Sequence, residues 1–536
     1  MEVKSMIALL SAYKSHLLTP KNIQKNIAAG LIVGIIALPV SMAFAIASGV
    51  HPASGIYTAI IAGLIVAIFG GTQVQISGPT GAFVIILANI TAQHGFVGLA
   101  CATFLAGILL ILMSIFKLGS IIKYMPYPVI VGFTTGIGLL IFVNQWPTFL
   151  GLPIELPSNA HFFHKIKLII GSLTKLDINT TFFGYFSLLI YFLTQKFIPR
   201  VPAPLTSLLI TTTALFISKN TSVATIGSAF GQIPQTIPML QIPNISTINW
   251  FALITPACTI ALLCAIESLL SATVADAITN TKHDSNQELF GQGMANMITP
   301  FFGGFTSTGA IARTVTNIRS GGNCPVAAIT HSLFLILIIY FFAPLAAHIP
   351  LCALATILLI IAYNMSDLDQ FMQITYHAPW YDVIVLLFTC FLTIMVDLVF
   401  AVTFGALLSI LFFKLRMYQT TELQQKSFIF ATLWKESITQ VSKTCENNII
   451  HFKIKGPFFF GAADKLEQAF AITDNDPACI VFNFAHVPFI DMTGLTIFHK
   501  IVQQFYRRGV KIYIESANDR IMKKIKKMNI DQFIQT

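Results

Sequence analysis

A glycine-rich polar stretch at residues 303–322 lies between two long apolar segments and contains a charged side chain, Arg313. A continuous membrane helix does not combine glycines, hydroxyls and a charge in this way, whereas a half-helix that begins in mid-membrane does. An earlier stretch, residues 75–83, has a short polar run typical of a strand, then Gly-Pro-Thr-Gly, then an apolar helix. Two such interrupted segments in comparable positions of two halves predict a transporter binding site.

The composition places the chain in a membrane. Of its 536 residues, 55% are hydrophobic and 10% are charged, and the mean hydropathy is +0.76, whereas a soluble domain carries about 25% charged residues. The formal charge of +10 comes mostly from basic residues at segment ends and in the C-terminal tail. Membrane topology explains this distribution, so we expect the lipid bilayer, and no nucleic acid, as a partner.

The same reading excludes an enzyme. The histidines show no metal-ligand spacing, the eight cysteines are scattered without a CxxC pair, and no nucleophile is patterned with a base. We therefore expect no metal, no cofactor and no catalytic residue.

The apolar segments form two sets of about seven, and the interrupted element is the third of each set, which predicts an inverted repeat. Pro39 lies in the middle of the first span, where we expect a kink or a break. The first set comprises residues 26–49, 52–70, 78–92, 96–115, 127–149, 181–197 and 202–217. The second comprises residues 253–278, 289–302, the half-helix after residue 303, and residues 326–346, 351–363, 381–396 and 398–413.

The predicted domains follow from these spans. Residues 1–25 are a basic cytoplasmic lead, residues 26–218 the first repeat, residues 219–250 an extracytoplasmic linker, and residues 251–416 the second repeat. Lysines and arginines gather on one side, apart from those in a polar loop at residues 165–175. The positive-inside rule therefore predicts a cytoplasmic membrane protein with both termini in the cytoplasm.

Residues 421–536 are expected to form a cytoplasmic α/β domain. Strands are predicted at residues 449–455, 479–484 and 510–515, and helices at residues 462–470, 493–508 and 519–528. This alternation is typical of a small α/β fold.

Four stretches in this order resemble the sulfate permease (SulP) family of anion transporters, whose animal members form the solute carrier 26 group. They are Ala37-Leu-Pro-Val-Ser-Met-Ala-Phe-Ala45 with Gly55-Ile-Tyr57, Ile76-Ser-Gly-Pro-Thr-Gly81, Gly309-Ala-Ile-Ala-Arg-Thr314 with Asn317-Ile-Arg-Ser-Gly321, and Ile490-Asp-Met-Thr-Gly-Leu495. The last of them is similar to the signature of a STAS domain.

The resemblance implies about fourteen membrane segments as an inverted repeat, a core domain that moves against a gate domain as in uracil-transporter-like folds, and a homodimer. It places the anion between the starts of the third and tenth helices. The substrate-binding residues that it implies are Phe44, Pro79, Thr80, Gly81, Ala82, Thr308, Gly309, Ala310, Ala312 and Arg313.

These residue types suit an anion. A helix N-terminus presents unpaired N–H groups and about half a positive charge, so two facing N-termini bind an anion without a fixed countercharge. Thr80 and Thr308 add hydroxyl donors, and Arg313 adds a full positive charge. Two alternatives remain open: the small residues merely pack helices, and Arg313 forms a structural ion pair with Glu267.

Glu267 is the second charge inside the membrane, and we hypothesise that it carries the coupling proton, with Ser271 one turn further in the same site. The alternative is a static hydrogen bond. Phe44 matches an aromatic that lines the family's site, and Val40 stands where glutamine is common in the family.

In the STAS-like motif, Asp491 or Thr493 is expected to cap the helix that contains Gly494, and regulatory phosphorylation of Thr493 is the alternative. A cytoplasmic protein partner of this domain is a further hypothesis.

The sequence thus predicts a secondary active transporter of a small anion, namely sulfate, bicarbonate or a C4-dicarboxylate, that works by alternating access with proton symport. Sodium-coupled bicarbonate uptake, anion exchange and nucleobase transport are alternatives within transport. A membrane-anchored STAS regulatory protein is the alternative from another class.

Overall fold

The computed structural model describes most of the chain. The described residues are 7–119, 126–154, 156–157, 160–199, 201–219, 221–236, 238–241, 248–279, 281–396, 398–421, 440–446, 449–455, 458, 479–487 and 489–534. They fall into two compact units: Met1–Lys123 with Ile137–Met365, and Tyr124–Gly136 with Ser366–Thr536.

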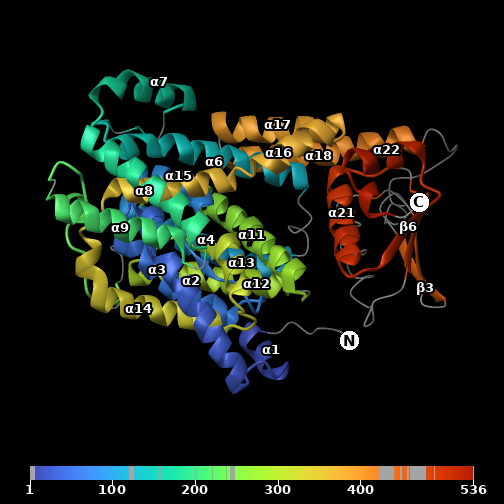
Figure 1. The fold of residues 1–536 in the computed structure, drawn as a ribbon, viewed down its shortest axis with the longest axis horizontal. Helices are drawn as coiled ribbons and strands as arrows, with labels where there is room; N and C mark the ends of the chain where they lie inside the picture. Colours follow the sequence, from blue (N-terminus) through green and yellow to red (C-terminus); the bar gives the residue numbers. More distant parts are fainter. Residues whose placement is uncertain are drawn as a thin grey trace. The chain divides into compact units, whose positions relative to one another are not determined.

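The first unit is built almost entirely of helices (Figure 1). Its early elements are α1 (Ala8–Lys14), α2 (Pro20–Ala47), α3 (Pro52–Phe69), β1 (Ser77–Gly78), η1 (Gly81–Phe83), α4 (Val84–Ile115), α7 (Phe162–Ser172), η2 (Leu173–Lys175), α8 (Ile178–Phe197) and α9 (Ala203–Ser218). Helix α6 (Tyr127–Leu150) starts in the second unit and continues in the first. The later elements are α10 (Ile226–Phe230), α11 (Trp250–Thr279), α12 (Ser285–Ile298), η3 (Thr299–Phe302), β2 (Thr308–Gly309), α13 (Ile311–Arg319), α14 (Val326–Ala346) and α15 (Leu351–Met365).

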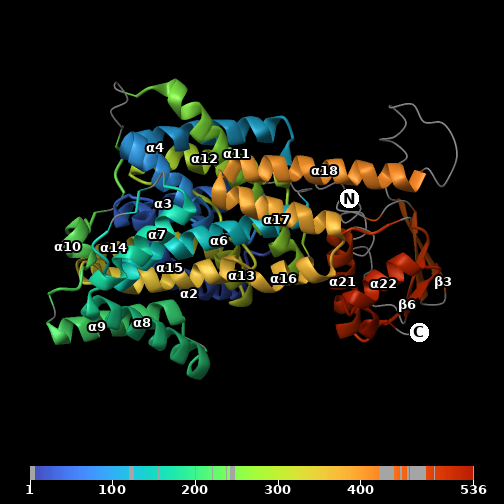
Figure 2. The same ribbon diagram turned by 90° about the horizontal axis from the view of Figure 1, so that it is seen from above.

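Among the described residues, seven helical segments are long and apolar enough to cross a membrane, or eight if the bent pair α7–α8 is one span. Shorter apolar helices are also present, such as α9, which lies beside α8 and is joined to it by a hydrogen bond between Ser187 and Ser207 (Figure 2). The chain is therefore an integral multi-pass helical membrane protein.

The first membrane helix differs from the prediction at both its start and its middle. Helix α2 begins at Pro20 rather than at residue 26, because proline at the first helical position has a pre-set φ and needs no N–H partner. The last residues of the predicted surface lead are thus helical. The helix also continues through Pro39 to Ala47, so of the kink or break expected at Pro39 the break is wrong, and the kink stays a prediction.

The polar loop expected at residues 165–175 is also wrong, because helix α7 and the short η2 occupy it. Phe162, Ile166 and Ile169 recur at helical spacing and form an apolar stripe, so the segment is amphipathic rather than irregular. Lys165 on this helix is buried and donates to the Asn144 side-chain oxygen at 3.3 Å.

Helix α4 contains the connection that was predicted near residue 95. Gly95 has φ 67° and ψ −177°, which divides the element into two helices at that residue. The positive φ favours glycine there. The segment thus consists of two helices, one on each side of Gly95, and forms one of the seven apolar segments counted above.

The membrane part of the second unit contains α16 (Leu368–His377), α17 (Trp380–Met395) and α18 (Leu398–Thr421). Helix α16 was not predicted as an element. Its sequence is amphipathic and mixed in polarity, so it lacks the apolar run by which the other spans were recognised.

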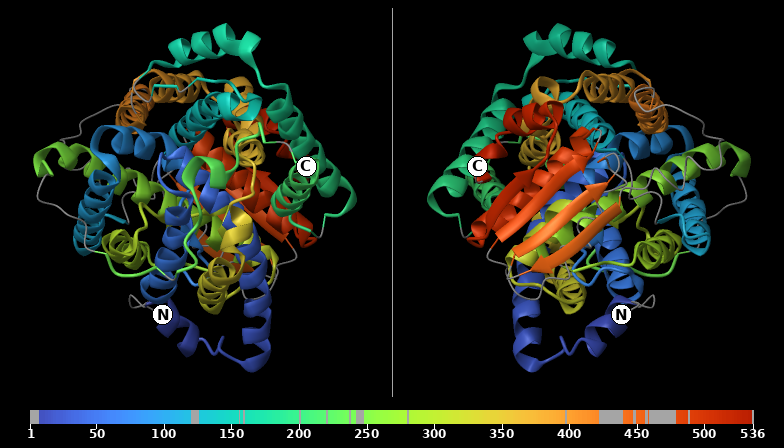
Figure 3. Two further views of the ribbon diagram at one scale, coloured as in Figure 1. Left: turned by 90° about the vertical axis from the view of Figure 1, so that its left-hand side faces the viewer. Right: turned by 90° about the vertical axis from the view of Figure 1, so that its right-hand side faces the viewer.

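The C-terminal part of the second unit is an α/β domain (Figure 3). Its elements are β3 (Gln440–Glu446), β4 (Ile449–Lys455), β5 (Cys479–His486), α21 (Met492–Arg507), β6 (Lys511–Glu515), α22 (Asp519–Lys527) and η4 (Asp531–Phe533). The strand order is β3-β4-β5-β6, with β3 antiparallel to β4 and the other two pairs parallel.

The core of this domain forms where α21 covers the sheet. The rings of Phe452, Phe482 and Phe498 are fully buried, and Phe482 meets Phe498 edge-on with centroids 5.0 Å apart. Strand β3 was missed by the sequence reading, and the helix expected at residues 462–470 lies outside the described residues. The α/β prediction is confirmed for the elements that are described.

Candidate functional site

A two-stranded ladder at the centre of the first unit joins the two interrupted elements. Strand β1 pairs antiparallel with β2, with Ser77 opposite Gly309 and Gly78 opposite Thr308. The backbone N–H of Ala310 donates to the Ile76 carbonyl at 2.9 Å. Backbone groups of both breaks thus satisfy each other, as a dry environment requires. Because the strands are antiparallel, the helices that follow them leave the ladder in opposite directions.

Arg313 ties the second half-helix to the start of the first. Its side chain is 5% exposed, and its Nη2 donates to the Pro79 carbonyl. A Cβ on Gly78 would lie 2.5 Å from Arg313 Nη1, so the guanidinium occupies space that only glycine leaves free. The guanidinium therefore lies directly at the break that precedes Thr80.

Glu267, on α11, meets the same break from another side. The Thr80 hydroxyl donates to a carboxylate oxygen of Glu267 at 2.9 Å. Arg313 and Glu267, both described, form no direct ion pair, since each is bonded to a different residue of the Pro79-Thr80 pair. The simple ion-pair alternative is thus not what the structure contains.

Helix α11 also contacts the second break. The Ser271 hydroxyl donates to Thr314 Oγ1 at 3.4 Å, and the hydroxyls of Ser268 and Thr308 lie 3.1 Å apart. Ser271, Thr308 and Thr314 are fully or almost fully buried. One face of α11 therefore touches the starts of both half-helices.

Phe44 lies at the start of the first half-helix. A Cβ on Gly81 would lie 3.3 Å from the Phe44 ring and 2.8 Å from the Met365 sulfur, so these side chains surround the bare backbone of Gly81. Ala82 and Ala310 are also buried near the two breaks. Ala312 differs from the other predicted residues because it is exposed, one residue before Arg313.

A supporting set of polar side chains on α12 was missed by the sequence reading. Asn296 holds Ser307 by both backbone groups, at 2.9 Å each. Gln292 and Glu288 lie one and two turns earlier on the same helix. The signal was present as a polar stripe at four-residue spacing, but the segment was interpreted only as a short apolar span.

Glu288 is fully buried and accepts four hydrogen bonds. The backbone N–H groups of Gly71 and Thr72 donate at 3.0 and 3.1 Å, and the side chains of Gln75 and Gln292 donate at 2.8 and 2.9 Å. Gln75 in turn packs against Gly309. Glu288 thus anchors the polar run that leads into β1.

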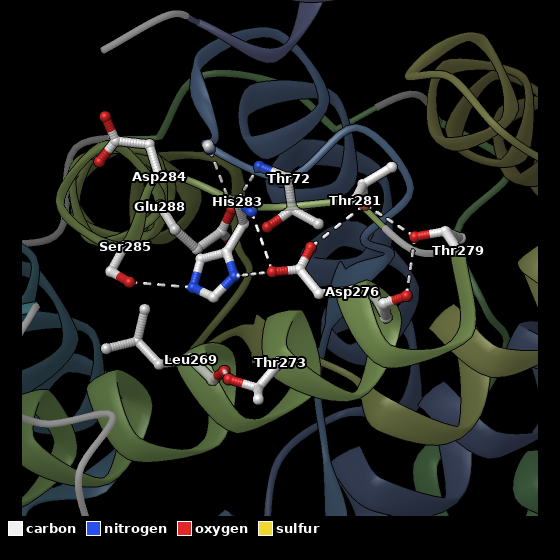
Figure 4. A network of polar contacts seen from close by, with 12 residues as sticks. Thr72, Leu269, Thr273, Asp276, Thr279, Thr281, His283, Asp284, Ser285 and Glu288 are labelled. Carbon is white, nitrogen blue, oxygen red and sulfur yellow. Dashed lines mark hydrogen bonds and ion pairs between the residues drawn. The ribbon is translucent and has the colours of Figure 1, made fainter. Parts of the chain in front are cut away.

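Figure 4 shows a second polar cluster beside Glu288, where α11 gives way to α12. The His283 ring lies between Asp276, at 2.7 Å from Nδ1, and the Ser285 hydroxyl, at 3.0 Å from Nε2. Asp276 also accepts from the backbone N–H of His283 at 2.9 Å. These contacts close the turn between the two helices.

In the second unit, the STAS-like motif contacts the membrane helices of the same unit. Asp491 caps α21 by accepting from the Gly494 N–H at 2.7 Å, as one of the two predicted caps. The Thr493 hydroxyl instead accepts from the Tyr127 N–H at 3.2 Å, and Asp382 accepts from the Met492 N–H at 3.0 Å. Thr493 is therefore a contact residue and not the cap.

Comparison with known proteins identifies both parts of the chain. The sequence pattern of the Sulfate permease family matches residues 23–389, and that of the STAS domain matches residues 440–536.

Two relatives with different names match nearly the whole chain. The putative sulfate transporter YvdB of Bacillus subtilis is 39% identical over 492 residues, which cover 92% of this chain and 91% of that protein. The bicarbonate transporter BicA of a Picosynechococcus species is 27% identical over 531 residues, which cover 95% of this chain and 91% of that protein.

Solved structures share the fold. The transmembrane domain of a cyanobacterial bicarbonate transporter BicA matches with a TM-score of 0.62 at 27% identity, covering 73% of this chain and 98% of that one. SLC26A9 matches with a TM-score of 0.70 at 17% identity, and the match covers 98% of this chain and 89% of that one.

Proposed function

The chain belongs to the sulfate permease family and is an integral multi-pass anion transporter with a C-terminal STAS domain, and from this premise we propose that it imports its anion by proton-coupled symport. Alternating access then carries the anion across, as the core domain moves against the gate domain. The proposal includes the architecture of about fourteen segments in an inverted repeat, for which the antiparallel β1–β2 ladder is the structural support.

The observation that carries the proposal is the meeting of two helix starts with Arg313. The ladder brings the breaks before η1 and α13 together, and the buried guanidinium adds a full positive charge beside the Pro79 carbonyl. Unpaired N–H groups and a cation in a low-dielectric site favour a small anion strongly. We assign the anion to the space bounded by these groups and Phe44.

Glu267 is the proposed proton carrier. Its carboxylate accepts from the Thr80 hydroxyl at one helix start, so its charge acts on the same site as that of Arg313. A proton on Glu267 removes the negative charge that would repel the anion, which couples protonation to anion binding. Release of the anion on the cytoplasmic side then favours release of the proton.

Sulfate is the first candidate substrate, because the relative that is 39% identical is named a putative sulfate transporter. Bicarbonate is the second, because two cyanobacterial relatives are named bicarbonate transporters. The helix starts recognise negative charge rather than one oxyanion, so a C4-dicarboxylate belongs to the same proposal. We place the protein in the cytoplasmic membrane as a homodimer with both termini in the cytoplasm.

The test is uptake of labelled sulfate, bicarbonate and fumarate into proteoliposomes, with and without an inward proton gradient and with parallel sodium gradients. We expect one anion to follow the proton gradient, and uptake to fall at least about 100-fold in Arg313→Ala, since loss of a buried charged partner costs roughly 3 kcal/mol or more. Uptake that follows sodium would instead make Glu267 an ion ligand.

Further experiments separate the proposal from its rivals. In Glu267→Gln, the anion should still bind while the proton gradient no longer drives uptake; full gradient-driven uptake in this variant would refute the coupling role. If the wild type moves a nucleobase but no anion, the substrate assignment is wrong. If transport-site substitutions leave a cellular phenotype intact, the STAS domain is the active part.

A further inference from the structure

A buried histidine on α14 has no role in the site described so far. The His331 side chain is fully buried, and neither of its ring nitrogens has a hydrogen-bond partner among the described residues. More than about 90% of buried polar groups in proteins are hydrogen-bonded, because an unpaired one costs roughly 1–3 kcal/mol. A buried imidazole without a described partner therefore calls for a functional explanation.

The ring lies behind the strand that precedes the first half-helix. A Cβ on Gly63 of α3 would lie 3.7 Å from His331 Cδ2, 3.7 Å from the Ser77 carbonyl and 2.5 Å from the Ser332 hydroxyl. The Ser332 hydroxyl is also buried without a partner among the described residues. The packing of α14 on α3 thus places an unpaired imidazole beside β1.

Arg313 lies against the same strand. The Cβ position of Gly78 is 2.5 Å from Arg313 Nη1 and 3.4 Å from Ala59, which lies one turn before Gly63 on α3. Arg313 Nη1 is also unpartnered among the described residues. The guanidinium and the His331 ring therefore flank neighbouring residues of β1.

The groups around α14 provide no acid to pair with a charged His331. Among the described residues, α2 carries Lys21 and Lys25 in its first turns, α3 carries the phenol of Tyr57, and α13 carries Arg313 and Arg319. A lone imidazolium at this depth beside a guanidinium is unfavourable. A negative charge bound at the neighbouring anion site is what would offset it.

The charge balance of the site then sets the number of protons that are carried with one anion. Arg313 and an ionised Glu267 cancel, so a divalent anion leaves two uncompensated negative charges in a dry site. A proton on the Glu267 carboxylate removes one of them. A proton on His331 removes the other, and the loaded site becomes neutral, which is the form that crosses a low-dielectric region at the smallest cost.

We propose that His331 is a second proton-binding site, so that one divalent anion is carried with two protons. The ring nitrogen takes up its proton when the anion is bound, and returns it to water on the cytoplasmic side when the anion leaves. This inference rests on the proposed proton-coupled symport and specifies its stoichiometry.

The test measures the sulfate gradient that balances a fixed proton gradient across proteoliposomes whose membrane potential is clamped at zero. At balance, each coupled proton multiplies the ratio of internal to external sulfate concentration by about ten per pH unit of gradient. The wild type should therefore sustain a ratio of about 100 per pH unit, and His331→Gln a ratio of about 10. His331→Asn serves as the second variant. His348→Gln, an exposed histidine just after α14, is the matched control and should keep the wild-type ratio.

A role of His331 in packing alone would lower the amount or the rate of transport but leave the balance ratio unchanged, and that result overturns the inference. A wild-type ratio of about 10 overturns it as well, without the need for any variant. Sulfate uptake by the wild type that ignores the proton gradient is a different outcome, because it overturns the proposed function itself.

Discussion

At Gly309, the absence of a side chain lets the two halves of the site pack closely together. Gly309 pairs with Ser77 in the ladder, and a Cβ at this position would lie 2.0 Å from Gln75 Nε2. Gln75 cannot simply move aside, because its amide donates to the buried Glu288 at 2.8 Å. The family resemblance implied only that Gly309 binds substrate, whereas the structure shows that side-chain packing requires glycine there.

Gly309→Ala should therefore lower stability by about 1–3 kcal/mol, the usual cost of overpacking, and should reduce anion uptake by displacing the ladder. Thermal unfolding in detergent and uptake in proteoliposomes measure the two effects. Gly171→Ala is the matched control, because a Cβ there meets no atom within 4 Å. Equal stability of the two variants would contradict the packing argument.

Glu288 supports the site through Gln75, whose side-chain amide donates to its carboxylate. Because all four of its hydrogen bonds come from N–H donors, the amide of Glu288→Gln would point an N–H group at another donor. We expect a loss of about 1.5–3 kcal/mol, typical of a hydrogen-bonded charged group. Faster hydrogen exchange at Gly71 and Thr72 than in the wild type would be the local readout, and unchanged exchange would refute the anchoring role.

At the scale of elements, helix ends were decided by capping residues. Asp177 begins α8 by accepting from the Thr180 hydroxyl at 2.5 Å and from the Thr180 N–H at 3.0 Å. Asp284 begins α12 by accepting from the backbone N–H groups of Asn286 and Gln287, both at 3.0 Å. This cap is why α12 starts before the predicted residue 289. Apolar patterning located these helices, but the caps set their first residues.

The Asp177 cap should be sensitive to acid. The side-chain hydrogen bond from Thr180 holds the pKa of Asp177 below its usual value of 3.8. The cap therefore stabilises α8 at pH values above the unfolded pKa, and this contribution is lost as the pH falls through the folded pKa. In melting experiments, Asp177→Ala should lose about 0.5–1 kcal/mol at neutral pH, and this difference from the wild type should disappear as the pH falls below the folded pKa of Asp177.

Asp177→Asn is the control for that experiment, because asparagine caps a helix equally well and does not titrate. Its stability should show no step from this position between neutral and acid pH. A difference between Asp177→Ala and the wild type that persists in acid would show that the ionised carboxylate is not what stabilises the helix.

At the scale of the whole molecule, the second unit connects membrane helices to the STAS domain through the end of α21. Val131, Leu386 and Ile374 of the membrane helices belong to the same buried apolar cluster as Met492 and Leu495. The Thr493 hydroxyl and the Asp382 carboxylate add polar bonds at its edge. The STAS motif is thus a docking contact within this unit as well as a helix start.

Thr493→Val should weaken this docking by about 0.5–1.5 kcal/mol, because the Tyr127 N–H loses its acceptor. Hydrogen exchange at the start of α6 in the full-length protein is expected to quicken. Thr496→Val is the matched control, since among the described residues that hydroxyl bonds only to the Met492 carbonyl within its own helix. Equal exchange in the two variants would show that the Thr493 bond does not contribute.

The sequence by itself determined the membrane class, the two interrupted elements and the STAS domain, and it marked Arg313 and Glu267 as the charged residues of the proposed site. These follow from local properties, because a charge or a run of glycines in an apolar segment is costly unless it has a function. The family resemblance rested on the same stretches, and the match over residues 23–389 confirms it.

Only the tertiary structure decided which groups meet. That Thr80 bonds Glu267 while Arg313 bonds Pro79, that Asn296 holds Ser307, and that His331 is buried without a described partner depend on helices far apart in the chain. A sequence carries no record of such contacts, since the same residues at the same spacing pair differently when the helices pack differently. The charged residues can be recognised from the local sequence, but the packing of distant helices determines which groups they contact.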